Sequence, residues 1–271
     1  MKVREIARFL DERFPLALQE KYDNAGGQVM FPDEEVRGVM VALDCDRGVV
    51  EEAAEKSVNL IVTHHPLLFS PLKALSAGDP RSEIIFKLVT ERVSLYAAHT
   101  NLDKVYYDKL AGVLDLKEPR LCVETDGTVS PGHEPRGFGV VGTLPAEMTV
   151  SAVLDALKRG LDLEYLVYSG DPGKTVGVIA LVNGSAGRMT EKIIRDHGPH
   201  CIVTGDVGYH HLKTAADYGV TVIDAGHYGT EKPLLNFLRR EIQDCLTKSG
   251  DENGIKAAIS ETERNPFRLY K

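Results

Sequence analysis

The segment Ile61-Val62-Thr63-His64-His65-Pro66 decides the fold class and locates the candidate site. Its apolar, β-branched beginning predicts a buried strand, and that strand ends in two adjacent histidines. Open α/β sheets bind ligands at the carboxyl ends of their strands, so both imidazoles would lie at the ligand-binding edge. Neutral imidazole is the commonest metal ligand in proteins. A single His-His pair also occurs in ordinary surface loops, so a metal site needs support from elsewhere in the chain.

Two other segments repeat this arrangement. Ala97-Ala98-His99-Thr100-Asn101-Leu102-Asp103 and Ala225-Gly226-His227-Tyr228-Gly229-Thr230-Glu231 each follow an apolar run and contain a histidine and a carboxylate. In both segments the carboxylate follows the histidine by four residues, so one helical turn would place the two side chains on the same face. The candidate ligands are therefore His64, His65, His99, Asp103, His227 and Glu231.

Imidazole and carboxylate together suit Zn, Mn, Fe or Co, and the absence of paired cysteines argues against a structural zinc finger. One metal uses about three protein ligands and an open position. Five or six ligands suit two metals about 3.5–4 Å apart, which Glu231 could bridge because a carboxylate has two oxygens. Two alternatives stay open: His99 could be a hydrogen-bonded histidine in a strand-end loop, and Asp206 could cap a helix.

Apolar runs alternate with segments of helical period along the chain, and this alternation is typical of βαβ units. It predicts an α/β fold of two similar halves with mainly parallel sheets and a metal site in the cleft between them. Residues 1–117 form the expected N-terminal half, the loosely patterned and proline-containing residues 118–136 a connection, and residues 137–271 the C-terminal half, with no large insertion domain. Strands are expected at 38–43, 59–62, 95–98, 137–144, 176–182, 202–203, 220–223 and 255–260. Helices are expected at 3–14, 47–56, 83–93, 150–159, 189–197 and 233–245, with Asp46 as the cap of the second of them.

Composition limits the function classes. The chain has 271 residues, of which 43% are hydrophobic, and its formal net charge is -8. This charge and the lack of a Lys/Arg cluster argue against nucleic acid as a partner. No apolar run approaches the roughly 18 residues of a membrane helix. No apolar run follows Met1-Lys2-Val3-Arg4-Glu5 either, so we expect no secretory signal. The four cysteines are far apart and indicate reduced thiols in a cytoplasmic protein.

Over nearly its whole length the sequence resembles the dinuclear metal centre family known as GTP cyclohydrolase I type 2, or Nif-three-like. The segments that carry the resemblance are Tyr22-Asp23-Asn24-Ala25-Gly26-Gly27-Gln28-Val29, Val62-Thr63-His64-His65-Pro66, Ala98-His99-Thr100-Asn101-Leu102-Asp103, Thr204-Gly205-Asp206 with Tyr209-His210, and Asp224-Ala225-Gly226-His227-Tyr228-Gly229-Thr230-Glu231. Two loops depart from the family. Gly26-Gly27-Gln28 stands where Gly-Leu-Gln is usual, and Asn183-Gly184-Ser185-Ala186-Gly187 stands where Gly-Gly-Ser-Gly is usual.

The resemblance implies two divalent metal ions per chain, of Zn, Fe or Mn. It assigns His65 and Asp103 to one ion, His64 and His227 to the other, and Glu231 to both. His99 and His210 match positions near the site that are not metal ligands, and we expect them to be catalytic residues.

The resemblance also implies a dinuclear metal-dependent hydrolase, with GTP cyclohydrolase-type opening of an imidazole ring as the reaction and a nucleotide or other small molecule as the substrate. The alternative is a non-enzymatic metal-binding or protein-interaction factor. The expected assembly is a homohexamer built as a trimer of dimers, with no membrane partner.

Overall fold

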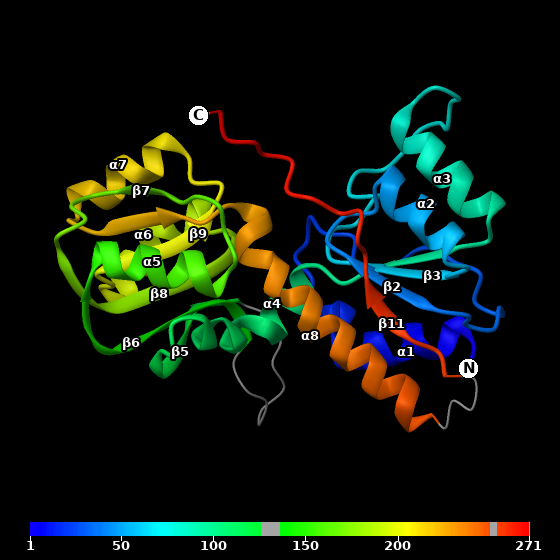
Figure 1. Ribbon diagram of the computed structural model, residues 1–271, viewed down its shortest axis with the longest axis horizontal. Helices are drawn as coiled ribbons and strands as arrows, with labels where there is room; N and C mark the ends of the chain where they lie inside the picture. Colours follow the sequence, from blue (N-terminus) through cyan, green and yellow to red (C-terminus); the bar gives the residue numbers. More distant parts are fainter. Residues whose placement is uncertain (126–135, 250–253, 271) are drawn as a thin grey trace. The chain divides into compact units, whose positions relative to one another are not determined.

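A computed structural model describes residues 1–125, 136–249 and 254–270 of the protein (Figure 1). The chain divides into two compact units. Unit 1 comprises Met1–Leu102 and Leu234–Lys271, and unit 2 comprises Asp103–Pro233. None of the helices in the described ranges combines the length and the apolar character needed to cross a bilayer.

These bounds differ from the halves expected from sequence. The C-terminal segment returns to the N-terminal unit, where its strand β11 (Ala257–Ile259) pairs with β2 (Val39–Ala42). All of strand β5 (Lys117–Glu124) except its first residue lies in the expected connection 118–136, and residues 126–135 of that connection lie outside the described residues.

The sheet of unit 1 has five strands in the order β1-β4-β3-β2-β11. Strands β4, β3, β2 and β11 run parallel to one another, and β1 pairs antiparallel with β4. Every residue of β2, β3 and β4 is buried, which is typical of parallel strands covered on both faces. The bounds of the strands not yet described are Gly26–Val29 for β1, Leu60–Thr63 for β3 and Ser94–Ala97 for β4.

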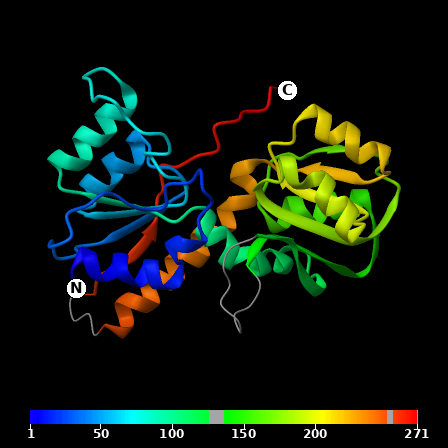
Figure 2. The same cartoon turned by 180° about the vertical axis from the view of Figure 1, so that it is seen from behind.

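Helices cover both faces of this sheet (Figures 1 and 2). Helices α2 (Arg47–Glu55) and α3 (Pro80–Thr90) lie on one face, while α1 (Val3–Arg13) and the C-terminal part of α8 (His227–Lys248) lie on the other. Asp46 caps α2 as predicted, since its carboxylate accepts a hydrogen bond from the Val49 N–H at 2.8 Å.

Two buried carboxylates hold the C-terminal segment against this unit. Glu52 accepts hydrogen bonds from the backbone N–H groups of Glu261 and Thr262. Glu263 accepts the Leu43 N–H at 2.9 Å. Burial, only partly opposed by this backbone hydrogen bond, raises the pKa of Glu263 to about 7.

The sheet of unit 2 has six strands in the order β5-β6-β8-β9-β10-β7. Strands β8, β9 and β10 are parallel, and β5, β6 and β7 pair antiparallel with their neighbours. The predicted α/β class is confirmed, but this sheet is more mixed than expected. The bounds are Gly137–Thr149 for β6, Val167–Ser169 for β7, Thr175–Ser185 for β8, Cys201–Gly205 for β9 and Thr221–Asp224 for β10.

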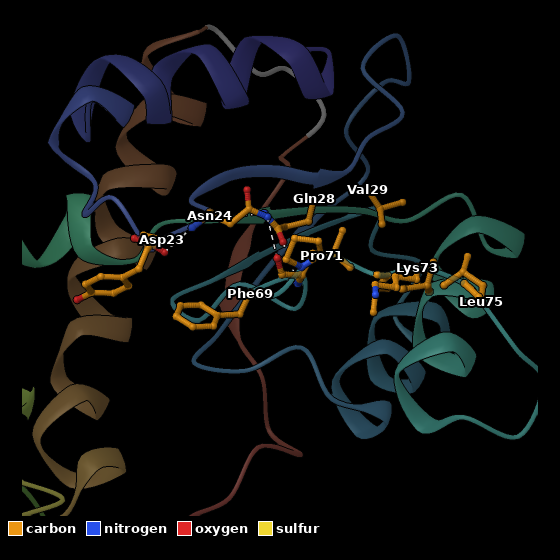
Figure 3. Close-up of a pocket in the computed structure, with 13 residues that line it drawn as sticks. Asp23, Asn24, Gln28, Val29, Phe69, Pro71, Lys73 and Leu75 are labelled. Atoms are coloured by element: carbon orange, nitrogen blue, oxygen red, sulfur yellow. Dashed lines mark hydrogen bonds between the residues drawn. The ribbon is translucent and has the colours of Figure 1, made fainter.

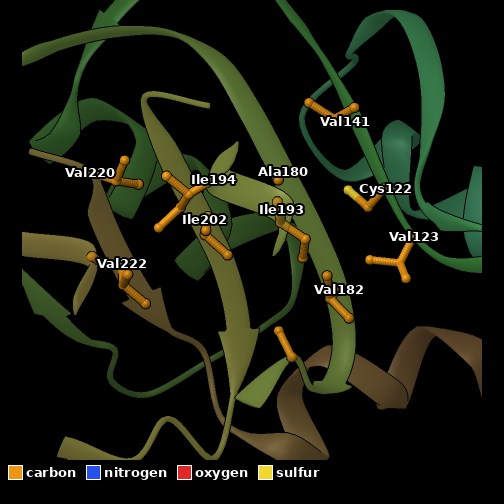
Figure 4. Packing of buried hydrophobic residues seen from close by; sticks show 12 residues of the cluster. Cys122, Val123, Val141, Ala180, Val182, Ile193, Ile194, Ile202, Val220 and Val222 are labelled. Atoms are coloured by element: carbon orange, nitrogen blue, oxygen red, sulfur yellow. The ribbon is translucent and has the colours of Figure 1, made fainter. Parts of the chain in front are cut away.

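Helices α6 (Thr190–His197) and α7 (Tyr209–Asp217) cover one face of this sheet, and α5 (Val150–Gly160) lies on the other face (Figures 1 and 2). Apolar side chains of the strands pack with Ile193 and Ile194 of α6 (Figure 4). The remaining helices are α4 (Thr100–Tyr106) and the short 3-10 helices η1 (Leu16–Leu18), η2 (Tyr107–Val113) and η3 (Gly187–Met189).

In each unit the parallel strands end at a common edge, where most of the predicted site residues follow them. In unit 1, Ala42, Thr63 and Ala97 are register partners, so the residues after β2, β3 and β4 come together. In unit 2, Asp224 of β10 is level with Thr204 of β9. The fold therefore supplies one group of candidate ligands in each unit.

Candidate metal centre

His64 follows β3 directly and is fully buried. Its Nδ1 lies 2.8 Å from the carbonyl oxygen of Ala98. A carbonyl can only accept a hydrogen bond, so Nδ1 carries the proton and the lone pair of the neutral ring is on Nε2. Such a hydrogen bond orients histidines that bind metals through the other nitrogen.

His65 is held in the same way by a different acceptor. Its Nδ1 lies 3.0 Å from Oδ1 of Asp44, which follows β2. This histidine–carboxylate pair again leaves the lone pair of the neutral imidazole on Nε2, and the carboxylate increases the basicity of the ring.

His99 follows β4, and its Nδ1 lies 2.7 Å from Oδ1 of Asp23. The Asp23 carboxylate also accepts the backbone N–H of Thr100 at 3.1 Å and the Thr100 hydroxyl, at the beginning of α4. Burial alone would raise the pKa of Asp23, but the hydrogen bonds from His99 and Thr100 outweigh it and lower the pKa to about 2. Asp23 is therefore a fixed negative charge that orients the His99 ring.

The three histidines form one cluster in unit 1. The His64 ring centroid lies 4.9 Å from that of His65 and 5.2 Å from that of His99. One nitrogen of each ring lies within 4.8 Å of the others, so the cluster could hold a metal ion. The structure therefore brings together three of the six histidines and carboxylates selected by sequence spacing, His99 included.

Unit 2 contributes a second group at the beginning of α8. His227 Nδ1 lies 2.8 Å from Oδ2 of Asp206, and its Nε2 lies 3.1 Å from Oε1 of Glu231. The four-residue spacing predicted that His227 and Glu231 share a helix face, and the structure confirms it.

The expected helix start at Pro233 was wrong, because α8 begins at His227 and Pro233 lies inside it. Asp206 does not cap α7, which was one of the two open alternatives, since the N-cap of this helix is Gly208.

Two glycines make room for this group. Gly184 has a φ of +59°, and a Cβ on it would lie 2.5 Å from Glu231 Oε1 and 3.4 Å from the His227 ring. A Cβ on Gly205 would lie 2.5 Å from the His227 backbone nitrogen. The backbone of β8 and β9 can therefore approach the two side chains only without side chains of its own at these positions.

Asp103, the remaining predicted ligand, lies in α4 and is buried. Its Oδ1 accepts a hydrogen bond from Asn183 Nδ2 at 2.5 Å. Asn183 precedes Gly184 on β8, so neighbouring residues of one strand contact Asp103 and Glu231.

Among the described residues, no hydrogen bond or ring contact joins His210 or Cys45 to the candidate ligands. His210 is exposed in the first turn of α7, with its ring 5.4 Å from that of Tyr209. Its predicted catalytic role stays a prediction. Cys45 is buried, and burial raises the pKa of its thiol to about 12, which excludes a thiolate nucleophile at neutral pH.

Sequence reasoning did not identify the residues that orient the ligands. These are Asp23, Asp44, Asp206 and Asn183. A usable signal was present, because Asp44 and Asp206 each come just after a predicted strand, as the histidines do. Carboxylates at strand ends next to candidate ligand histidines are expected to orient them.

The sequence model of the Duf34/NIF3 family (NGG1p interacting factor 3) matches residues 1–266. The chain belongs to this family. A relative from Clostridium acetobutylicum, named GTP cyclohydrolase 1 type 2 homolog, is 31% identical over 272 aligned positions that cover 99% of each chain.

Solved structures share the fold. A Bacillus cereus protein related to NIF3 has a TM-score of 0.90 at 21% identity, with 100% of this chain and 99% of that chain covered. A Staphylococcus aureus protein has a TM-score of 0.84 at 26% identity, with the same coverage. The predicted family and fold class are thus both confirmed.

Proposed function

We propose that the protein is a dinuclear metal-dependent hydrolase whose metal ligands are His64, His65, Asp103, His227 and Glu231. The observation that carries the proposal is a shared geometry. His64, His65, His99 and His227 each have Nδ1 within 3.0 Å of a protein oxygen. In each neutral ring this orients Nε2 as the nitrogen that can bind a metal.

The donor set fits two divalent ions. Three imidazoles and two carboxylates are more ligands than one ion uses while it keeps an open position. The absence of a side chain at Gly184 supports a bridging role, because a Cβ there would lie 2.5 Å from Glu231 Oε1 and take the space of the carboxylate. Two ions at such a site supply Lewis acidity, which lowers the pKa of water and polarises the bond to be cleaved.

We propose that His99 is the general acid–base residue, which transfers a proton during the hydrolysis. Its Nδ1 is held by Asp23, so Nε2 can accept or donate a proton while the ring keeps its orientation. His99→Ala should keep the metals and lower turnover. Loss of metal from this variant would instead make His99 a ligand, as its place in the histidine cluster also allows.

The name of the relatives directs the first substrate test to GTP. Purified protein loaded in turn with Zn, Mn or Fe would be incubated with GTP and a panel of other nucleotides, and opening of the imidazole ring would be followed by absorbance. Metal-dependent turnover that is lost in His227→Ala supports the proposal. Full metal occupancy with no turnover on any compound would favour the non-enzymatic alternative.

The expected homohexamer has a test of its own. If the chain forms a hexamer, light scattering should give the mass of six chains.

A further inference from the structure

Unit 1 contains a cavity of about 820 Å³, a volume typical of small-molecule sites (Figure 3). One wall comes from the segment 22–29 and the other from the segment 68–75. Ile85 of α3 completes the lining.

Side-chain amides join the two walls. Asn24 Nδ2 donates to the Leu68 carbonyl at 2.8 Å, and Gln28 Oε1 accepts the Leu68 N–H at 3.0 Å. Gln28 Nε2 also donates to the Asn24 carbonyl at 2.7 Å. These hydrogen bonds join the two segments to each other, so binding would not have to order the walls.

One end of the cavity is aromatic and adjoins the histidine cluster. The rings of Tyr22 and Phe69 are 6.3 Å apart, and the side chains are 64% and 46% exposed. The Phe69 ring also lies 6.1 Å from His99 in an edge contact. Exposed aromatic rings with this spacing offer faces on which a flat heteroaromatic ring can stack.

The other end carries a positive charge. In Figure 3, Lys73 lies at the end of the cavity opposite Asp23. Among the lining residues that the structure describes, Asp23 and Lys73 are the charged ones, and the Asp23 carboxylate is occupied by His99 and Thr100. In a protein with a net charge of -8, a single lysine at this end favours a ligand with one anionic group.

We propose that this cavity binds the substrate of the metal centre, and that the substrate is a flat heteroaromatic ring joined to a single anionic group such as a phosphate monoester. The ring lies against Tyr22 and Phe69, next to His99, and the anionic group lies at Lys73. The inference rests on the proposed function and adds to it the orientation and the charge of the substrate.

The test is calorimetric titration of the full-length, metal-loaded protein with three probes. These are guanosine 5′-monophosphate, guanosine, which lacks the charge, and ribose 5-phosphate, which lacks the ring. Phe69→Ala should weaken binding of the monophosphate and of guanosine about tenfold. Lys73→Met, which keeps the apolar stem, should weaken the monophosphate about twofold to fivefold and leave guanosine unchanged.

Phe86→Ala and Lys109→Met are matched controls, since Phe86 is 38% exposed and neither residue lines the cavity. Both should bind all three probes as the wild type does. Equal affinity of the wild type for guanosine and its monophosphate would overturn the inference. So would wild-type binding by Phe69→Ala, or no binding of either ring compound at millimolar concentration.

Metal content measured on the same samples separates the two proposals. If Phe69→Ala and Lys73→Met keep two ions per chain and bind the probes as the wild type does, the cavity proposal is refuted and the metal-centre proposal stands. A wild-type protein that holds no metal overturns the metal centre, whatever it binds in the cavity.

Discussion

The carboxylate of Asp103 accepts a hydrogen bond from Asn183 Nδ2 at 2.5 Å, and both side chains are buried. The amide donates to Oδ1 and so fixes the rotation of the carboxylate. Partners of this kind tune the affinity of the ligands that they contact.

Asn183→Leu should therefore weaken metal binding, because leucine has a similar size but no donor. The expected loss is about tenfold in affinity for one ion, measured by competition with a chromophoric chelator. Ser185→Ala on the same strand, where the side chain is exposed, is the control and should bind as the wild type does. An Asn183→Leu affinity equal to that of the control would show that the hydrogen bond does not position Asp103.

Gly184→Ala should displace Glu231, because its Cβ would lie 2.5 Å from Oε1. Gly198→Ala is a matched control, since Gly198 has a φ of +55° against +59° for Gly184 but has open space around it. Both variants should lose about 1–2 kcal/mol of unfolding free energy from backbone strain. After dialysis only Gly184→Ala should lose metal, and equal retention by the two variants would contradict the steric argument.

Glu231→Gln keeps the shape of the side chain but removes the charge that offsets the repulsion between two cations. We expect loss of at least one ion with the fold intact, measured by elemental analysis and circular dichroism. Glu191→Gln on the surface of α6 should keep both ions. If Glu231→Gln also keeps both, Glu231 does not bridge them.

Glu263 should make stability depend on pH. Its pKa is raised from 4.5 to about 7, so the folded protein keeps a proton in this range that the unfolded chain has already lost. Stability therefore falls as pH rises from 4.5 towards 7. Glutamine at this position has no proton to lose. As the pH rises through this range, the unfolding free energy of Glu263→Gln should therefore increase by about 1–3 kcal/mol relative to that of the wild type, measured by urea denaturation. A constant difference between the two proteins would refute the raised pKa.

Much of the fold and of the ligand set could be predicted from local sequence. The β-branched run 61–63 and the histidines that follow it specify a buried strand and its ligand-binding edge without reference to the rest of the chain. The same holds for Asp46, whose capping role depends on the helix that it precedes.

Other features depend on contacts between distant segments. The pairing of β11 with β2 joins residues more than 200 positions apart, and no periodicity in either segment indicates it. The start of α8 was misplaced because proline favours the first turn of a helix, whereas here six helical residues from His227 onwards precede it. The partnership of Asn183 with Asp103 likewise arises only once β8 and α4 are packed together.

The central claim is that this chain binds two metal ions, and metal stoichiometry tests it most directly. The purified protein would be saturated in turn with Zn, Mn and Fe, freed of excess metal by gel filtration, and analysed for metal and protein. The account predicts a ratio near two ions per chain for at least one of these metals. A ratio that stays at or below one with every metal would contradict it.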